Sequence, residues 1–156
     1  MSASEDTLIT PDALNKPIGV RPDWRSGGDV DIDGLEAELR KSVEGEVRFD
    51  PGSKAMYAVD ASNYRQVPIG VVIPRDKEAV IKTVALCHQY GAPITSRGGG
   101  TSLAGQCCNV AVVMDFSKYM HGIINIDPQR RLATVQPGCV LDDLRSTAAK
   151  QHELMF

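Results

Sequence analysis

Three consecutive glycines, Gly98 to Gly100, are the feature of this 156-residue sequence that most restricts its fold. They directly follow a short predicted strand at 93–96 and precede Thr101 and Ser102. Three residues without a Cβ leave the backbone free to adopt positive φ angles and let another group approach it closely. Successive backbone N–H groups in such a turn form a concavity that suits an anion, and the two hydroxyl groups add donors. We therefore interpret Arg97 to Gln106, the glycine loop, as an anion-binding loop.

The residues before this loop predict a strand, a helix and a strand. The continuous apolar run Gly70 to Pro74 is typical of a buried strand. Asp76 is expected to cap a helix that runs to about Tyr90, and Gly91 supplies its stop. The second strand follows at 93–96, so the spacing predicts a βαβ unit with a right-handed crossover.

Apolar residues at helical spacing indicate which face each of two predicted helices buries. In the helix that follows Asp76, the inward residues are expected to be Val80, Ile81, Val84 and Cys87, with His88 packed near them. In a last helix at about 141–151, the inward residues are expected to be Leu141, Leu144 and Ala148.

Further strands are expected before and after the helix that follows Asp76 in the chain. A third strand is predicted at 110–114, and a hairpin is predicted with arms at 121–126 and 132–135. Near the start of the chain, a brief strand at 47–49 is expected to end at Asp50-Pro51-Gly52. The sequence therefore predicts an α+β fold.

Several acidic residues are expected to stabilise the ends of elements. Asp31 or Asp33 is suited to cap a first helix, because a carboxylate accepts from the free N–H groups of a first turn. Asp115 is expected to cap the turn after the third strand. Asp60 and Ser62 fit either a turn or a contact with a ligand.

The two ends of the chain define the expected domain organisation. Residues 1–30 are polar and rich in Pro, Gly, Asp and Ser, which predicts a flexible leader. The chain ends on the apolar residues 154–156 directly after a predicted helix, an odd finish for a complete domain. We therefore expect residues 31–156 to be the N-terminal part of one domain, truncated before its second half.

Composition excludes several classes of function. The formal net charge is −3, which gives no reason to expect binding to nucleic acid. No apolar run approaches the roughly 20 residues that a membrane-spanning helix needs. The N-terminus lacks the basic start and apolar stretch of a signal peptide, so we expect a cytoplasmic protein.

The four cysteines fit neither a disulfide framework nor a metal site. None of them forms a C-x-x-C pair, and the adjacent Cys107 and Cys108 cannot close an ordinary disulfide without severe strain. Ligands at zinc-site spacing are missing. We expect reduced thiols that serve as small packing residues, and no bound metal.

The glycine loop differs from two familiar phosphate-binding loops. The glycine spacing of a P-loop is present from Gly100 to Gly105, but Gln106-Cys107 follows where a P-loop has Lys and Ser or Thr. In the dinucleotide fingerprint G-x-G-x-x-G, Leu103 stands where the third glycine belongs, and a strand rather than a helix follows. Hydrolysis of ATP or GTP and a Rossmann site are therefore not expected.

The combined pattern resembles the FAD-linked oxidase family. The segments that carry the resemblance are 72–74 at the end of a strand, 93–102 through the glycines, and Val135-Gln136-Pro137-Gly138 after the hairpin. Tyr57-Ala58-Val59-Asp60-Ala61-Ser62 is similar to the glycolate oxidase and D-lactate dehydrogenase branch. The resemblance covers about residues 45–156 and implies the first, βαβ-containing subdomain of a vanillyl-alcohol oxidase type FAD-binding domain.

The resemblance implies where FAD binds. Its pyrophosphate would lie on the glycine loop, and Pro74, Pro137 and Gly138 would line the same cleft. Related branches that attach FAD covalently have a histidine directly after the glycines, where this chain has Thr101. We therefore expect non-covalent FAD. The expected cofactor-binding residues are Arg97, Gly98, Gly99, Gly100, Thr101, Ser102, Leu103, Gly105, Gln106, Pro74, Pro137 and Gly138.

The resemblance also implies an activity for the parent protein, which would oxidise a small 2-hydroxy acid such as D-lactate or glycolate by hydride transfer to flavin. The catalytic residues and the substrate site would lie downstream, so the fragment itself is expected to be inactive. Two alternatives remain: the FAD-binding part of a sugar-nucleotide reductase-like flavoenzyme, and a non-catalytic nucleotide-binding module. Apolar surface left by the missing half makes a homodimer plausible.

Overall fold

The computed structural model describes residues 30–155, so all but the last residue of the expected leader lie outside the described part of the chain. The helices are α2 (Ile32–Ser42), α3 (Pro51–Met56), α4 (Lys77–Gln89) and α5 (Leu141–His152). The strands are β1 (Gly45–Arg48), β2 (Gly70–Pro74), β3 (Ile94–Arg97), β4 (Val112–Asp115), β5 (Ile123–Asp127) and β6 (Leu132–Val135). Within residues 30–155, no helix is long and apolar enough to cross a membrane.

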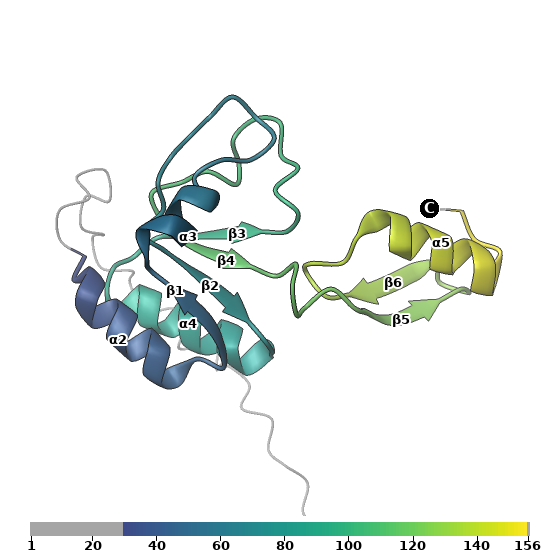
Figure 1. The fold of residues 1–156 in the computed structure, drawn as a ribbon. Helices are drawn as coiled ribbons and strands as arrows, with labels where there is room; N and C mark the ends of the chain where they lie inside the picture. The colour runs from purple at the N-terminus through teal and green to yellow at the C-terminus, as the bar shows by residue number, and fades with distance from the viewer. Residues whose placement is uncertain (1–29, 156) are drawn as a thin grey trace, which may run out of the picture.

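The first six elements and β4 build a four-stranded sheet with helices beside it (Figure 1). Its strand order is β1-β2-β4-β3. Strand β1 runs antiparallel to β2, whereas β2 and β3 both run parallel to the central β4. The predicted strand, helix and strand are thus present, with β4 inserted between the two strands. The carboxyl ends of β2, β4 and β3 consequently lie at one edge of the sheet.

Helices α2 and α4 cover one face of this sheet and enclose the main core (Figure 1). Asp31 begins α2 and Asp76 begins α4, and each carboxylate accepts from an N–H of the first turn, as predicted. Leu35 and Leu39 of α2 are fully buried against the sheet. Burying a leucine side chain contributes about 1.5–3 kcal/mol, so this layer stabilises the sheet strongly.

The predicted inward face of α4 is partly wrong. The buried residues are Ala79, Thr83 and Cys87. Ile81 and Val84 are 55% and 45% exposed. His88, which was expected to pack, is exposed as well. At 100° per residue the buried stripe lies opposite Ile81 and His88, so α4 presents its smaller side chains to the neighbouring sheet and helix and leaves larger ones in solvent.

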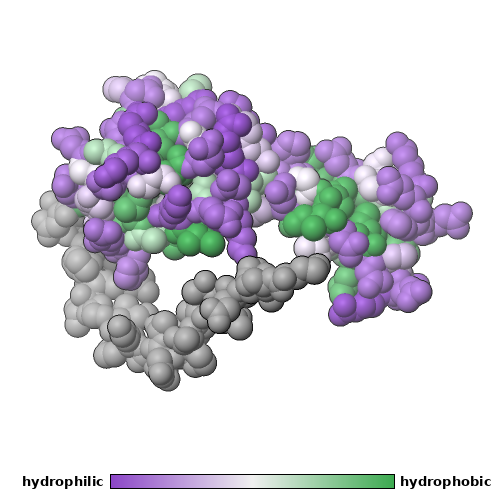
Figure 2. Space-filling model, turned by 90° about the horizontal axis from the view of Figure 1, so that it is seen from below, coloured by the Kyte–Doolittle hydropathy of each residue, from purple (hydrophilic) through white to green (hydrophobic). Residues whose placement is uncertain are grey.

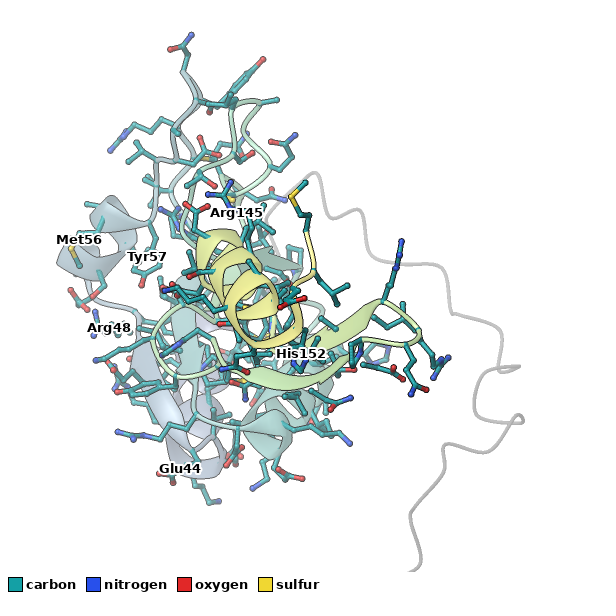
Figure 3. All side chains as sticks on the ribbon, turned by 90° about the vertical axis from the view of Figure 1, so that its right-hand side faces the viewer. Glu44, Arg48, Met56, Tyr57, Arg145 and His152 are labelled. Carbon is teal, nitrogen blue, oxygen red and sulfur yellow. The ribbon has the colours of Figure 1, made fainter. Side chains whose placement is uncertain are left out.

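The opposite face of the sheet has a thinner cover. Val71, Ile73 and Val113 are buried there beneath the rings of Tyr57 and Tyr119. Tyr57 follows the short helix α3, beside Arg48 of β1 (Figure 3).

Helix α3 is absent from the prediction. Residues 50–52 do end β1, but Asp50 also caps α3 by accepting from the N–H of Ser53, and Pro51 occupies the first turn. Proline is well suited to that position, because the N–H that it lacks would have no partner there.

The last three elements, β5, β6 and α5, form a separate hairpin unit (residues 123–152) at the end of the chain (Figure 1). The hairpin is confirmed, and α5 buries Leu144 and Ala148 as predicted. Leu141 is 58% exposed, so its expected inward position is wrong. Residues 141–143 are exposed and Leu144 is the first buried residue of α5, so the first turn of the helix faces solvent.

Candidate functional site

The glycine loop leaves the sheet at the edge where the three parallel strands end. Arg97 is the last residue of β3 and pairs in register with Asp115, the last residue of β4. Pro74 ends β2 at the same edge and is fully buried. Ligand sites of sheets with parallel strands occur outside the carboxyl ends of those strands. The topology therefore puts the predicted loop where such a site is expected.

Two of the loop glycines are required by the fold of the loop itself. Gly100 has a φ of 69° and Gly105 a φ of 80°, a region that residues with a side chain rarely adopt. A Cβ on Gly100 would lie 2.5 Å from an Arg97 guanidinium nitrogen, and a Cβ on Gly105 would lie 2.7 Å from the ring of Tyr64. A Cβ on Gly98 would meet no atom within 4 Å. The absence of a side chain at Gly98 therefore leaves open space beside the backbone.

The backbone N–H groups in the middle of the loop have no acceptor within the described part of the chain. Among residues 30–155, no backbone or side-chain group accepts a hydrogen bond from any amide between Gly98 and Gly105. The next two amides are engaged, because the N–H of Gln106 donates to Ser102 Oγ and that of Cys107 donates to Asp60 Oδ2. A hydrogen bond to a charged acceptor contributes about 1.5–3 kcal/mol, so several of these donors together suit a phosphate group.

The side chains of the loop differ in exposure. Thr101 and Gln106 are exposed, and Leu103 is 80% exposed. Ser102 donates from its hydroxyl to Gln106 Oε1, which closes the loop from within. The hydroxyl of Thr101 thus remains the more accessible of the two predicted donors.

Arg97 acts as a structural tie. Its Nη1 donates to the carbonyl of Val59 at 2.8 Å, and its guanidinium lies over the ring of Tyr57, 5.1 Å from the centroid. The contacts establish the tie, and the charge is retained beside Gly100.

The other predicted cofactor residues border the segment that follows β4. Gly138 donates from its N–H to the carbonyl of Met120 at 2.8 Å, and a Cβ at Gly138 would lie 2.3 Å from the carbonyl oxygen of Phe116. Pro137 is exposed next to it. Phe116 in turn donates from its N–H to the carbonyl of Arg97. The fold therefore brings Pro137-Gly138 to the edge from which the glycine loop starts.

A hollow of about 310 Å³ lies elsewhere, between α5 and the hairpin. It is lined by Ile126, Arg131, Leu132, Ala133, Leu144, Ala148, Glu153, Leu154 and Met155. Figure 2 shows hydrophobic side chains gathered on this part of the molecule. No residue predicted to bind the cofactor lines the hollow, so it is distinct from the glycine loop.

A family model described as an FAD-binding domain matches residues 68–156, which is more than half of the chain. The chain belongs to this FAD-binding domain family.

Several curated relatives match most of the chain. A D-2-hydroxyglutarate dehydrogenase from Pseudomonas putida is 33% identical over 78% of this chain and 12% of its own length. Glycolate oxidase subunit GlcD from Bacillus subtilis is 34% identical over 69% of this chain and 24% of its own length. The mitochondrial D-lactate dehydrogenase (cytochrome) of Kluyveromyces lactis is 31% identical over 69% of this chain and 19% of its own length. The chain thus spans about a quarter or less of these relatives.

Solved structures share the fold. The p-cresol methylhydroxylase structure superimposes with a TM-score of 0.65 at 21% identity, over 76% of this chain and 24% of that one. A structure of 6-hydroxy-D-nicotine oxidase from Arthrobacter nicotinovorans gives a TM-score of 0.58 at 28% identity, over 70% of this chain and 24% of that one. These matches confirm the α+β fold class, the resemblance to the vanillyl-alcohol oxidase type of domain, and FAD as the cofactor of the family.

Sequence reasoning missed one contact at the edge of this FAD-binding domain. The buried carboxylate of Asp115 accepts from Ser117, which confirms the predicted turn cap. It also accepts from the hydroxyl of Tyr57 at 2.6 Å. Burial and this hydrogen bond raise the pKa of Tyr57 to about 12, so the hydroxyl stays protonated and remains a donor at neutral pH. The Tyr57–Ser62 run had signalled a family branch but no contact with the sheet.

Proposed function

We propose that the glycine loop binds the pyrophosphate of FAD without a covalent bond. The observation that carries this proposal is the run of amides from Gly98 to Gly105, which donate to no group within residues 30–155 and follow the carboxyl end of a parallel strand. Membership of the FAD-binding domain family supports FAD as the source of this anion. Thr101 stands where covalent branches have histidine, so it contributes a hydroxyl donor and no attachment point.

We propose further that Pro74, Pro137 and Gly138 line the cleft that receives the cofactor. Pro74 ends β2 at the edge where the parallel strands end, Gly138 lies against Phe116 after β4, and Pro137 is exposed beside Gly138. Fixed backbone at Pro74 and close packing at Gly138 keep that edge rigid, which limits the ordering cost of binding.

The parent protein is proposed to oxidise a small 2-hydroxy acid. The relatives that match are dehydrogenases or oxidase subunits named for D-2-hydroxyglutarate, glycolate and D-lactate. FAD supplies a two-electron acceptor in such a reaction. The residues of this chain would hold and orient the cofactor, and the substrate site would be formed by domains that this chain does not include. We therefore expect no turnover from the chain alone.

Self-association into a homodimer is a further proposal. It is supported by apolar side chains on the hairpin unit that stay exposed, among them Ile124, Leu132 and Leu141. Light scattering after size-exclusion chromatography tests it, and a mass of one chain would refute it. A cytoplasmic location stays a prediction.

Titration of the purified chain with FAD, followed by flavin fluorescence, tests the assignment of the loop. Gly98→Ala adds a methyl group where the free protein has open space, so the apo fold should be unchanged. Because the methyl group would keep a phosphate oxygen away from the loop amides, FAD binding should fall at least about tenfold, the effect of one lost charge-assisted hydrogen bond. Gly52→Ala in α3 is the matched control and should bind as the parent does. Equal affinity of Gly98→Ala and the parent chain would contradict the assignment.

A further inference from the structure

The segment Tyr57–Ser62, here called the bracing segment, contacts the start of the glycine loop and the residue directly after its end. At the start of the loop, the Arg97 guanidinium donates to the carbonyl of Val59, and the N–H of Ala61 donates to the carbonyl of Gly100 at 3.0 Å. At the far end, the N–H of Cys107 donates to the carboxylate of Asp60 at 3.3 Å. The free amides therefore lie between two fixed points.

The bracing segment is itself attached to the sheet. Tyr57 donates from its hydroxyl to the buried carboxylate of Asp115, and the same ring supports the Arg97 guanidinium. Asp60 accepts from the N–H of Ser62, which folds the segment into a turn and aims its second oxygen at Cys107. The carboxyl end of β4 is thus connected through Tyr57 to the bracing segment, whose Ala61 N–H donates to the carbonyl of Gly100.

Three glycines in sequence make such a brace necessary. Glycine loses more backbone freedom on ordering than any other residue, so an unsupported Gly98–Gly100 turn would spend most of its time in conformations that do not present its amides to one ligand. Ordering the loop in the free protein moves that cost from binding to folding, which is how preorganisation raises affinity.

We propose that the bracing segment sets the conformation of the glycine loop before the cofactor arrives, with Arg97, Tyr57 and Asp60 as positioning residues. This inference rests on the proposed binding of pyrophosphate by the loop. Within residues 30–155, no carboxylate lies within salt-bridge distance of Arg97. Arg97 therefore also keeps an unpaired positive charge against Gly100, where it favours a dianion.

The test compares Arg97 with Arg65, an arginine that lies shortly after the bracing segment. Arg97→Gln removes the tie, whereas Arg65→Gln removes the same charge from an exposed side chain that makes no ion pair within the described residues. Amide exchange is measured by NMR on the free full-length chain. Arg97→Gln should speed exchange of the Ala61 and Cys107 amides by about tenfold or more, the effect of one lost charge-assisted hydrogen bond. Arg65→Gln should leave both rates unchanged.

Controls separate local loosening from loss of the fold. Exchange in β2 and β4 should not change in either variant. Arg97→Lys keeps the charge and one donor, so it should restore most of the lost protection. If Arg97→Gln does not fold, Tyr57→Phe serves instead, because it removes only the hydroxyl that anchors the segment to Asp115. Unchanged exchange of Ala61 and Cys107 in a folded variant overturns the brace.

Flavin titration of the same proteins distinguishes this inference from the proposed function. Affinity for FAD should fall at least about tenfold in Arg97→Gln and stay at the parent value in Arg65→Gln. A parent chain that binds no FAD, while Arg97→Gln still loosens Ala61 and Cys107, would refute pyrophosphate binding and leave the brace standing. Tight FAD binding with no change of exchange would refute the brace alone.

Discussion

The four-stranded sheet and the hairpin unit bury their apolar residues to different extents. In the sheet, Leu35, Leu39 and Val72 are fully buried between β-strands and the helices α2 and α4. In the hairpin unit, the only buried apolar side chains are those of Leu144 and Ala148 in α5, and a hollow remains beside them. A two-stranded hairpin needs further strands or a packed helix for independent stability, and here the helix buries only these two side chains. The glycine loop starts from the better-packed region, which gives the free amides a rigid base.

The largest expected effect tests this difference in packing directly. Leu39→Ala leaves a cavity in the closed core and should lower the free energy of unfolding by about 3–5 kcal/mol. Leu144→Ala removes a side chain that borders an existing hollow, so the surrounding residues lose fewer contacts. Its loss should be about 2 kcal/mol or less. Urea denaturation of both variants gives the two values, and equal losses would show that the hairpin unit is as well packed as the sheet.

Helix capping gives a second, smaller contrast. Asp76 caps α4 through the N–H of Ala79 at 2.7 Å, whereas Val140 begins α5 without any side-chain cap. Asp76→Ala should therefore destabilise the sheet region by about 1 kcal/mol, and Val140→Ser should stabilise the hairpin unit by about 0.5–1 kcal/mol. The helical signal of α5 can be followed during thermal unfolding. A destabilising Val140→Ser would mean that the exposed valine makes a contact that capping cannot replace.

The sequence predicted those parts of the fold that local patterns control. The apolar run of β2 and the capping position of Asp76 needed only neighbouring residues, and the hairpin needed only its turn. The position of β4 between β2 and β3 was not predictable in this way, because parallel neighbours depend on a strand that occurs later in the chain. Helix α3 was missed since its six residues include a glycine and a proline, which favour turns.

The candidate site was predictable to a similar degree. The glycine loop was recognisable because its proposed function depends on consecutive residues. Its support was not, since the hydrogen bond between Tyr57 and Asp115 joins positions 58 residues apart. The buried stripe of α4 was misjudged because Ile81 is larger and more apolar than Thr83, yet close packing of the helix selected the smaller residue. Which face of α4 is buried therefore cannot be predicted from the residue types of the helix alone.

The smallest expected effect concerns the face of the sheet opposite α2 and α4. There Glu46 of β1 accepts hydrogen bonds from Lys118, Tyr119 and Arg48. These hydrogen bonds, that from Lys118 first, lower the pKa of Glu46 from 4.5 to about 2. Since the folded pKa is depressed, the stabilisation is present above pH 4.5 and is lost as the pH falls toward 2.

Denaturation of the parent chain and Glu46→Gln between pH 7 and pH 2 measures this contribution. The parent should be more stable at pH 7, and the difference should shrink steadily below pH 4.5, because protonated Glu46 and glutamine then interact alike with the three donors. The hairpin unit contains no residue of this network, so unfolding of α5 should show no such pH-dependent difference. A difference that persists unchanged at pH 2 would mean that hydrogen bonds independent of charge hold Lys118 and Tyr119 against β1.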